Sequence, residues 1–170
     1  MLPRVPAQDF AARRRWMTRI GLTLNESKTR RCDARCEPFT FLGYTFGPMY
    51  FPRTGRRYDG AQPSKKAIAS IKERIRRQLR PGNQAPWEEV AGALNRLLRG
   101  WAAYFSYGSV TKARTAVNLH VYHAVRRFLR RRHKVAGPGF RQFPASRVFG
   151  ELGVLSLERF PRRASAHAST

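Results

Sequence analysis

Residues 63–79 read PSKKAIASIKERIRRQL, and their apolar side chains recur at helical spacing. Steps of three and four place these side chains on one helical face: Ile68, Ile71, Ile75 and Leu79. Ser64 stands just before this face, and serine is a residue type that caps helix starts. The stretch therefore predicts an amphipathic helix that must bury one face against another element.

Two further helices follow the same pattern. Pro86 opens the first, Glu88 and Glu89 lie in its first turn, and Gly108 closes it. Its apolar residues are Val90, Leu94, Leu97, Leu98, Trp101, Tyr104 and Phe105, and the i,i+4 spacing of Trp101 and Phe105 predicts that both lie in the core. The second covers residues 112–134, with core positions at Val117, Val121, Ala124, Val125, Phe128 and Leu129. Because three apolar stripes can bury one another, we expect a mainly α fold built on a three-helix bundle.

The region before residue 63 has a different composition. Residues 8–20 have the spacing of a helix that ends at Gly21. Residues 39–46 are rich in aromatic residues and predict a strand that ends at Gly47-Pro48. The basic residues 53–58 read as a loop or hairpin turn that returns to Pro63. We therefore expect a short β-hairpin within residues 32–58.

These changes of pattern divide the chain into four parts. Residues 1–62 hold a helix and the hairpin, and residues 63–134 hold the bundle. Residues 135–160 are punctuated by glycine and proline, and Val148-Phe149 and Val154-Leu155 are expected to pack against the bundle. Residues 161–170 are expected to be a disordered tail.

The charge balance is extreme. The chain has 34 basic and 10 acidic residues, which gives a net charge of +24. The predicted helix at 112–134 contains no acidic residue, although a solvated face usually balances its cations at i,i+4. Nucleic acid is the expected partner, because bound phosphates neutralise clustered cations and release counterions. A membrane is not expected, because the bundle core uses the apolar stripes and no apolar stretch is long enough to span a bilayer.

Catalytic and metal sites find little support in the sequence. The only adjacent carboxylates, Glu88 and Glu89, point to different helix faces. Cys32 and Cys36, with His120 and His123, form two isolated pairs that lack the compact spacing of zinc-binding signatures. We therefore expect no catalytic residue, no metal and no cofactor. Two cysteines also cannot build a disulfide framework, which favours a reducing, bacterial-type cytoplasm.

Several segments resemble, in order, the C-terminal part of group II intron reverse transcriptase/maturases. Residues 21–30 (GLTLNESKTR) and 41–46 (FLGYTF) resemble the last palm segments. Residues 63–66 (PSKK) and 94–105 (LNRLLRGWAAYF) resemble the maturase-specific X/thumb region, and residues 126–134 and 149–153 continue the match. The resemblance covers about residues 10–158, and the succession of short motifs is what makes it specific.

The resemblance implies a protein that binds intron RNA, helps it fold and splice, and copies it by reverse transcription. Residues 1–62 would then be a palm remnant and 63–134 the thumb/maturase X domain. No Tyr-x-Asp-Asp motif of the palm occurs in the sequence, so we expect no catalysis by this chain alone. Ala103 stands where the family often has Asn, which puts a polar contact from that position in doubt.

Three hypotheses follow for the function. In the first, the chain is an RNA-binding splicing factor that holds the phosphate backbone of structured intron RNA. In the second, it is a truncated RNA-directed DNA polymerase that needs a partner chain for palm and fingers; the full-length family holds an RNA–DNA hybrid. In the third, it is a decayed fragment without a function. The expected phosphate contacts are Lys65, Lys66, Lys72, Arg76, Arg96, Arg99, Arg126, Arg127, Arg130, Arg131 and Lys134. Tyr104 and Tyr107 are expected to stack on bases or to offer their hydroxyls.

Overall fold

A computed structural model of the chain describes residues 15, 18, 19, 21 and 36–160. The chain divides into two compact units, Met1–Asp33 and Ala34–Thr170. In the first unit the Gly21 amide donates to the Thr18 carbonyl at 3.1 Å. Most of the predicted helix at 8–20, the resemblance at 22–30, Cys32 and the predicted tail at 161–170 lie outside the described residues. The second unit carries the elements discussed below.

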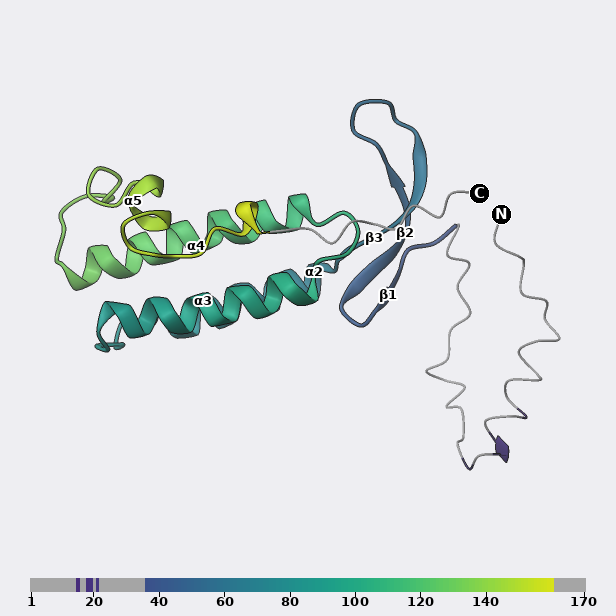
Figure 1. Ribbon diagram of the computed structural model, residues 1–170, viewed down its shortest axis with the longest axis horizontal. Helices are drawn as coiled ribbons and strands as arrows, with labels where there is room; N and C mark the ends of the chain where they lie inside the picture. Colours follow the sequence, from purple (N-terminus) through teal and green to yellow (C-terminus); the bar gives the residue numbers. More distant parts are fainter. Residues whose placement is uncertain (1–14, 16–17, 20, 22–35, 161–170) are drawn as a thin grey trace. The chain divides into compact units, whose positions relative to one another are not determined.

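The strands of the second unit form one antiparallel sheet. Its strands are β1 (Phe39–Phe41), β2 (Tyr44–Tyr50) and β3 (Arg57–Pro63), in the order β1-β2-β3 (Figure 1). Leu42 and Gly43 join β1 to β2 with φ angles of 47° and 79°, the positive values of a type I′ hairpin. The prediction of a single strand at 39–46 rested on aromatic composition, which does not reveal this turn. The turn divides the predicted strand into β1 and the start of β2.

The prediction that the strand ends at Gly47-Pro48 is wrong, because β2 continues to Tyr50. Pro48 pairs with Asp59 of β3. The pairing of β2 with β1 ends at Phe46, which is opposite Phe39. At Pro48, therefore, β2 is bonded on one side only. A proline without an N–H is tolerated there, because no strand within residues 36–160 lies on its other side to receive the bond.

The main body is the predicted three-helix bundle. Its helices are α2 (Lys65–Gln78), α3 (Trp87–Tyr104) and α4 (Thr111–Arg132), within a few residues of the sequence expectation. The Ser64 hydroxyl accepts a hydrogen bond from the Ala67 amide at 3.1 Å, which confirms the predicted cap. The mainly α fold with a small N-terminal β element is confirmed. None of the helices in the described part of the chain is long and apolar enough to cross a lipid bilayer.

The buried core follows the predicted apolar stripes. Trp101 and Phe105 are buried, with ring centroids 5.1 Å apart. The other fully buried side chains of the three helices include Ile71, Ile75, Leu94, Leu98, Val117, Val121 and Val125. Burial of this apolar surface is the main stabilising term, and it leaves the basic side chains on the outside.

Backbone contacts fix the direction of each helix relative to the sheet. The Ser64 amide donates to the Gly43 carbonyl at 2.8 Å, and the Ser109 amide donates to the Ala61 carbonyl at 2.7 Å. α2 and α4 therefore begin at the sheet and α3 ends there, which Figure 1 also shows. It follows that α2 and α4 run parallel to each other and antiparallel to α3.

Residues 135–160 close the bundle along α3 and α4. They include α5 (Ala145–Phe149) and the short 3-10 helix η1 (Leu157–Arg159). Val148 and Val154 are buried in the core, which confirms the prediction that these short pieces pack against the bundle. Asn95 of α3 accepts from the Leu155 amide at 2.8 Å, and Asn118 of α4 accepts from the Leu157 amide at 3.1 Å. Two asparagines thus hold this segment between the helices.

Candidate nucleic-acid interface

The C-terminal half of α4 separates apolar and basic side chains sharply. Val125, Phe128 and Leu129 are buried in the bundle. The basic residues beside them in the sequence are half-buried or exposed: Arg126, Arg127, Arg130 and Arg131. The last turn is favourable for cations, because the helix macrodipole is negative at its C-terminus.

The chain turns back sharply after α4. The Lys134 amide donates to the Arg131 carbonyl at 3.2 Å, and the Val135 amide donates to the Arg130 carbonyl at 3.0 Å. Lys134 has a φ of 51°, and this pair of bonds with a left-handed residue is the Schellman motif. The motif directs residues 135–140 back along the arginine face of α4.

The returning segment encloses a concave site, which we call the arginine pocket. Its volume is about 490 Å³, and it is lined by Arg126, Arg127, Arg130, Gly137 and Pro138. Arg130 Nη1 donates to the Gly137 carbonyl at 2.9 Å, which ties the pocket's two walls together. Three arginine side chains line this open site, and arginine suits an anion because its guanidinium can offer paired N–H donors to phosphate oxygens.

Arg126 is held in place by aromatic rings. Its Cζ lies 3.5 Å from the centroid of the Phe140 ring and 5.2 Å from that of Tyr122. Its Nη1 is buried and has no hydrogen-bond partner among the described residues. A buried donor without a partner costs free energy, so the two rings hold this guanidinium against that cost.

Carboxylates do not neutralise this face within residues 36–160. The ion pairs described there join Glu73 to Arg76 and Arg77, and Glu151 to Arg147. None of them involves the arginines of the arginine pocket or Arg131. Part of the excess charge expected from the sequence therefore lies at the end of α4, and no acidic partner for it is found among the described residues.

A second basic group lies where α2 packs against α4, and we call it the seam cluster. It consists of Lys72 and Arg76 on α2, and His120 and Arg127 on α4. Burial lowers the pKa of His120, and the positive charges of Arg76, Lys72 and Arg127 lower it further. The Lys72 backbone carbonyl acts in the opposite direction. His120 Nε2 is buried and finds no hydrogen-bond partner in the described part of the chain.

The sequence-predicted residues are thus distributed over more than one surface. Arg126, Arg127 and Arg130 meet in the arginine pocket, and Lys72, Arg76 and Arg127 meet in the seam cluster. The remaining predicted cations are exposed and line neither group: Lys65, Lys66, Arg96, Arg99, Arg131 and Lys134. Arg127 belongs to both groups.

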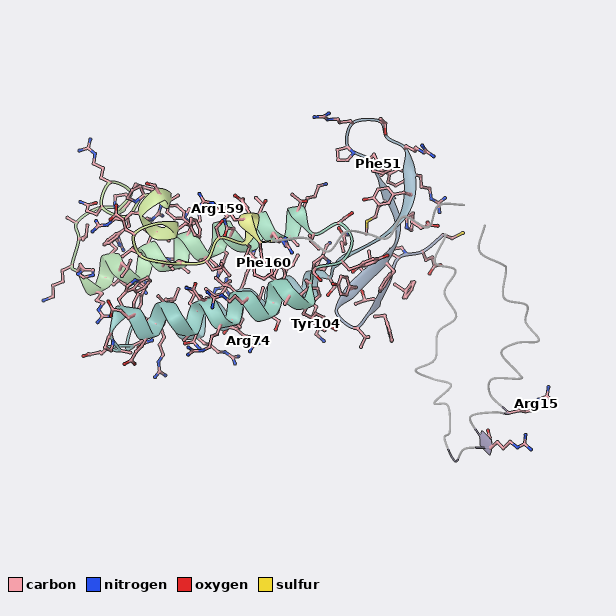
Figure 2. All side chains as sticks on the ribbon, viewed as in Figure 1. Arg15, Phe51, Arg74, Tyr104, Arg159 and Phe160 are labelled. Carbon is pink, nitrogen blue, oxygen red and sulfur yellow. The ribbon has the colours of Figure 1, made fainter. Side chains whose placement is uncertain are left out.

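The two predicted tyrosines occupy the junction of α3 with the sheet. The Tyr104 hydroxyl donates to the Leu42 carbonyl at 2.9 Å, and the Tyr44 hydroxyl donates to the Tyr104 carbonyl at 2.8 Å. Figure 2 shows Tyr104 at this end of α3. The Tyr104 hydroxyl is therefore bonded to the β1–β2 turn, although the residue is 56% exposed. Tyr107 is also exposed.

Sequence reasoning missed four residues of the arginine pocket and the seam cluster or in contact with them. Phe140 is 52% exposed and carries the Arg126 guanidinium, while Gly137 and Pro138 form a wall of the arginine pocket. His120 was considered only as a metal ligand. The available signal was the i,i+7 spacing of His120 and Arg127, which places both on one helical face.

The two cysteines and two histidines considered as zinc ligands do not share one element of the fold. His120 and His123 lie on α4, Cys36 is exposed, and Cys32 lies outside the described residues. Among the described residues, no group of three or more His, Cys, Asp or Glu side chains is placed to hold a metal ion.

The region that carries the arginine pocket and the seam cluster is similar to a known protein family. Residues 68–149 match the family model described as the group II intron, maturase-specific domain. No curated protein matches the chain. The matched region includes every residue of the arginine pocket and of the seam cluster, together with Phe140.

Proposed function

We propose, from the premise that residues 68–149 are a group II intron maturase-specific domain, that this chain binds structured intron RNA through its phosphate backbone. Binding assists the folding and splicing of that RNA. A folded RNA brings phosphates of different strands close together, and a surface of arginines reduces their repulsion. The chain needs to perform no bond-making step in this role.

The arginine pocket is the observation that carries the proposal. It gathers Arg126, Arg127 and Arg130 around one cavity, without a carboxylate partner among the described residues. Arginine binds phosphate through two parallel donors and stacks on exposed bases, so a concave arginine site suits a bent backbone with unstacked nucleotides. Bends and unpaired loops of that kind are common in folded RNA and rare in duplex DNA.

The direct test is a binding titration with the full chain. We expect structured group II intron RNA to bind more tightly than a single-stranded RNA of equal length and scrambled sequence, and more tightly than duplex DNA. Affinity should fall linearly with the logarithm of salt concentration, with a slope of about −0.7 to −0.9 per phosphate contact. Equal affinity for all three nucleic acids at matched salt would rule out a maturase role.

A splicing assay tests the assistance itself. The intron RNA is incubated at a magnesium concentration at which it splices slowly alone, with and without the chain. We expect faster splicing with the chain, and less acceleration with Arg126→Gln than with Arg147→Gln. Both variants remove one positive charge, but Arg147 is paired with Glu151 at 3.2 Å and does not line the arginine pocket. The same loss in both variants would mean that only net charge matters.

A further inference from the structure

His120 lies on the face of α4 that meets α2, among positive charges. Lys72 and Arg76 stand on the same face of α2, four residues apart, and Arg127 stands two turns beyond His120 on α4. His120 Nε2 is buried and has no hydrogen-bond partner among residues 36–160. The free chain therefore places a titratable ring beside three cations, and only the Lys72 backbone carbonyl among the groups acting on it favours a positive charge there.

The charges around this ring come from each neighbouring element. α2 contributes Lys72 and Arg76, and α4 contributes Arg127. Glu73 on α2 bonds to Arg76 at 3.3 Å and to Arg77 at 3.4 Å, so its carboxylate is engaged with those guanidinium groups. η1 meets α4 through Asn118, and the charged side chain of α5, Arg147, pairs with Glu151. No carboxylate is among the groups that act on His120.

We propose that a phosphate of bound nucleic acid sits between Lys72, Arg76 and Arg127, and that His120 takes up one proton from solvent when it does. The inference rests on the proposed function, because it needs a polyanion at this surface. It adds a specific subsite at the α2–α4 seam and a linkage between RNA binding and pH.

The physical reason is the change in local charge. In the free chain partial burial and the three cations lower the pKa of the imidazole. A phosphate adds negative charge beside them and offsets their repulsion of a fourth positive charge. The bound state then binds a proton more readily than the free state, so binding strengthens as pH falls. One linked proton limits the change to about tenfold in Kd per pH unit.

The test compares Kd for the same intron RNA at pH 8.0, 7.0 and 6.0 and at fixed ionic strength. We expect Kd of the unmodified chain to fall by about three- to tenfold across this range, from the one-proton linkage. His120→Gln should lose most of this pH dependence. His123→Gln and His133→Gln are the matched controls, and both should keep it.

A second measurement reports the proton itself. Calorimetric titration in two buffers with different ionisation enthalpies gives the number of protons taken up on binding. We expect uptake with the unmodified chain and less with His120→Gln. An unchanged pH dependence and proton uptake in His120→Gln would overturn the inference and leave the proposed function intact. Failure of the chain to bind structured RNA selectively at pH 8.0 would instead overturn the proposed function.

Discussion

The Arg126 guanidinium lies over the ring of Phe140, with its Cζ 3.5 Å from the ring centroid. The two residues are 14 positions apart, so their contact depends on the turn that follows α4. Stacking fixes the plane of the guanidinium and therefore the direction in which its donors point. Phe140 thus acts as a positioning residue for the arginine pocket.

Replacing Phe140 should loosen Arg126 without removing any charge. We expect Phe140→Ala to weaken RNA binding by about 0.5–1 kcal/mol, the value of an exposed cation–π contact, and Phe140→Tyr to retain affinity. Filter binding at fixed salt measures both. Leu119→Ala is the control, since Leu119 is a similarly exposed apolar residue of α4. If the Phe140→Ala and Leu119→Ala chains bind equally well, the stack does not position Arg126.

Salt dependence should distinguish arginines of the basic surface from arginines elsewhere. Arg127 belongs to both the arginine pocket and the seam cluster, whereas Arg77 is exposed on α2 and bonds to Glu73 at 3.4 Å. We expect Arg127→Gln to reduce the slope of log K against log salt by about 0.7–0.9, and Arg77→Gln to reduce it by much less. Equal reductions in the two variants would show diffuse attraction without a defined surface.

The helical part of this surface could be predicted from the sequence, and the pocket could not. Periodicity located α2, α3 and α4 within a few residues and assigned Trp101 and Phe105 to the core. The pocket depends on a long-range return of the chain, for which Gly137 and Pro138 give only a local turn signal. The same limit applies to the sheet, where Leu42-Gly43 does not resemble the Asn-Gly pair that usually marks such a turn.

The backbone conformation of Lys134 should destabilise the turn after α4. It holds a φ of 51° at a position that glycine usually occupies in a Schellman motif. We expect Lys134→Gly to raise the free energy of unfolding by about 0.5–1 kcal/mol, because glycine adopts this conformation without steric cost. Urea denaturation measures the gain. RNA affinity should fall in the same variant if Lys134 contacts phosphate, and an unchanged or lower stability would contradict the strain.

Asn118 should matter for stability more than its position in a basic helix suggests. Its Oδ1 accepts from the Leu157 amide at 3.1 Å, and its side chain is buried. We expect Asn118→Ala to lower the free energy of unfolding by about 1–3 kcal/mol, because the buried Leu157 amide is left without an acceptor. Urea denaturation, with exposed Leu119→Ala as the control, measures the difference. Similar curves for the two variants would mean that the C-terminal segment is held mainly by its apolar side chains.

The stability of the free chain should depend on His120 in the opposite sense to RNA binding. Its pKa in the fold is lowered by burial and by Arg76, Lys72 and Arg127, below the ordinary value of 6.5 that it regains on unfolding. The unfolded chain therefore binds more protons as pH falls through this value, and protonation favours unfolding. The contribution of His120 is fully present above pH 6.5 and is lost as pH decreases toward the lower folded-state pKa.

We therefore expect the stability of the unmodified chain relative to His120→Gln to decrease between pH 8 and pH 5 in the absence of RNA. Comparing the two chains cancels the titration of the groups that they share. Urea denaturation at a series of pH values gives both free energies of unfolding. Added RNA should reduce the decrease, because a phosphate at the seam cluster compensates the protonated ring. A stability difference that stays constant with pH would show that the fold does not disfavour the imidazolium at position 120.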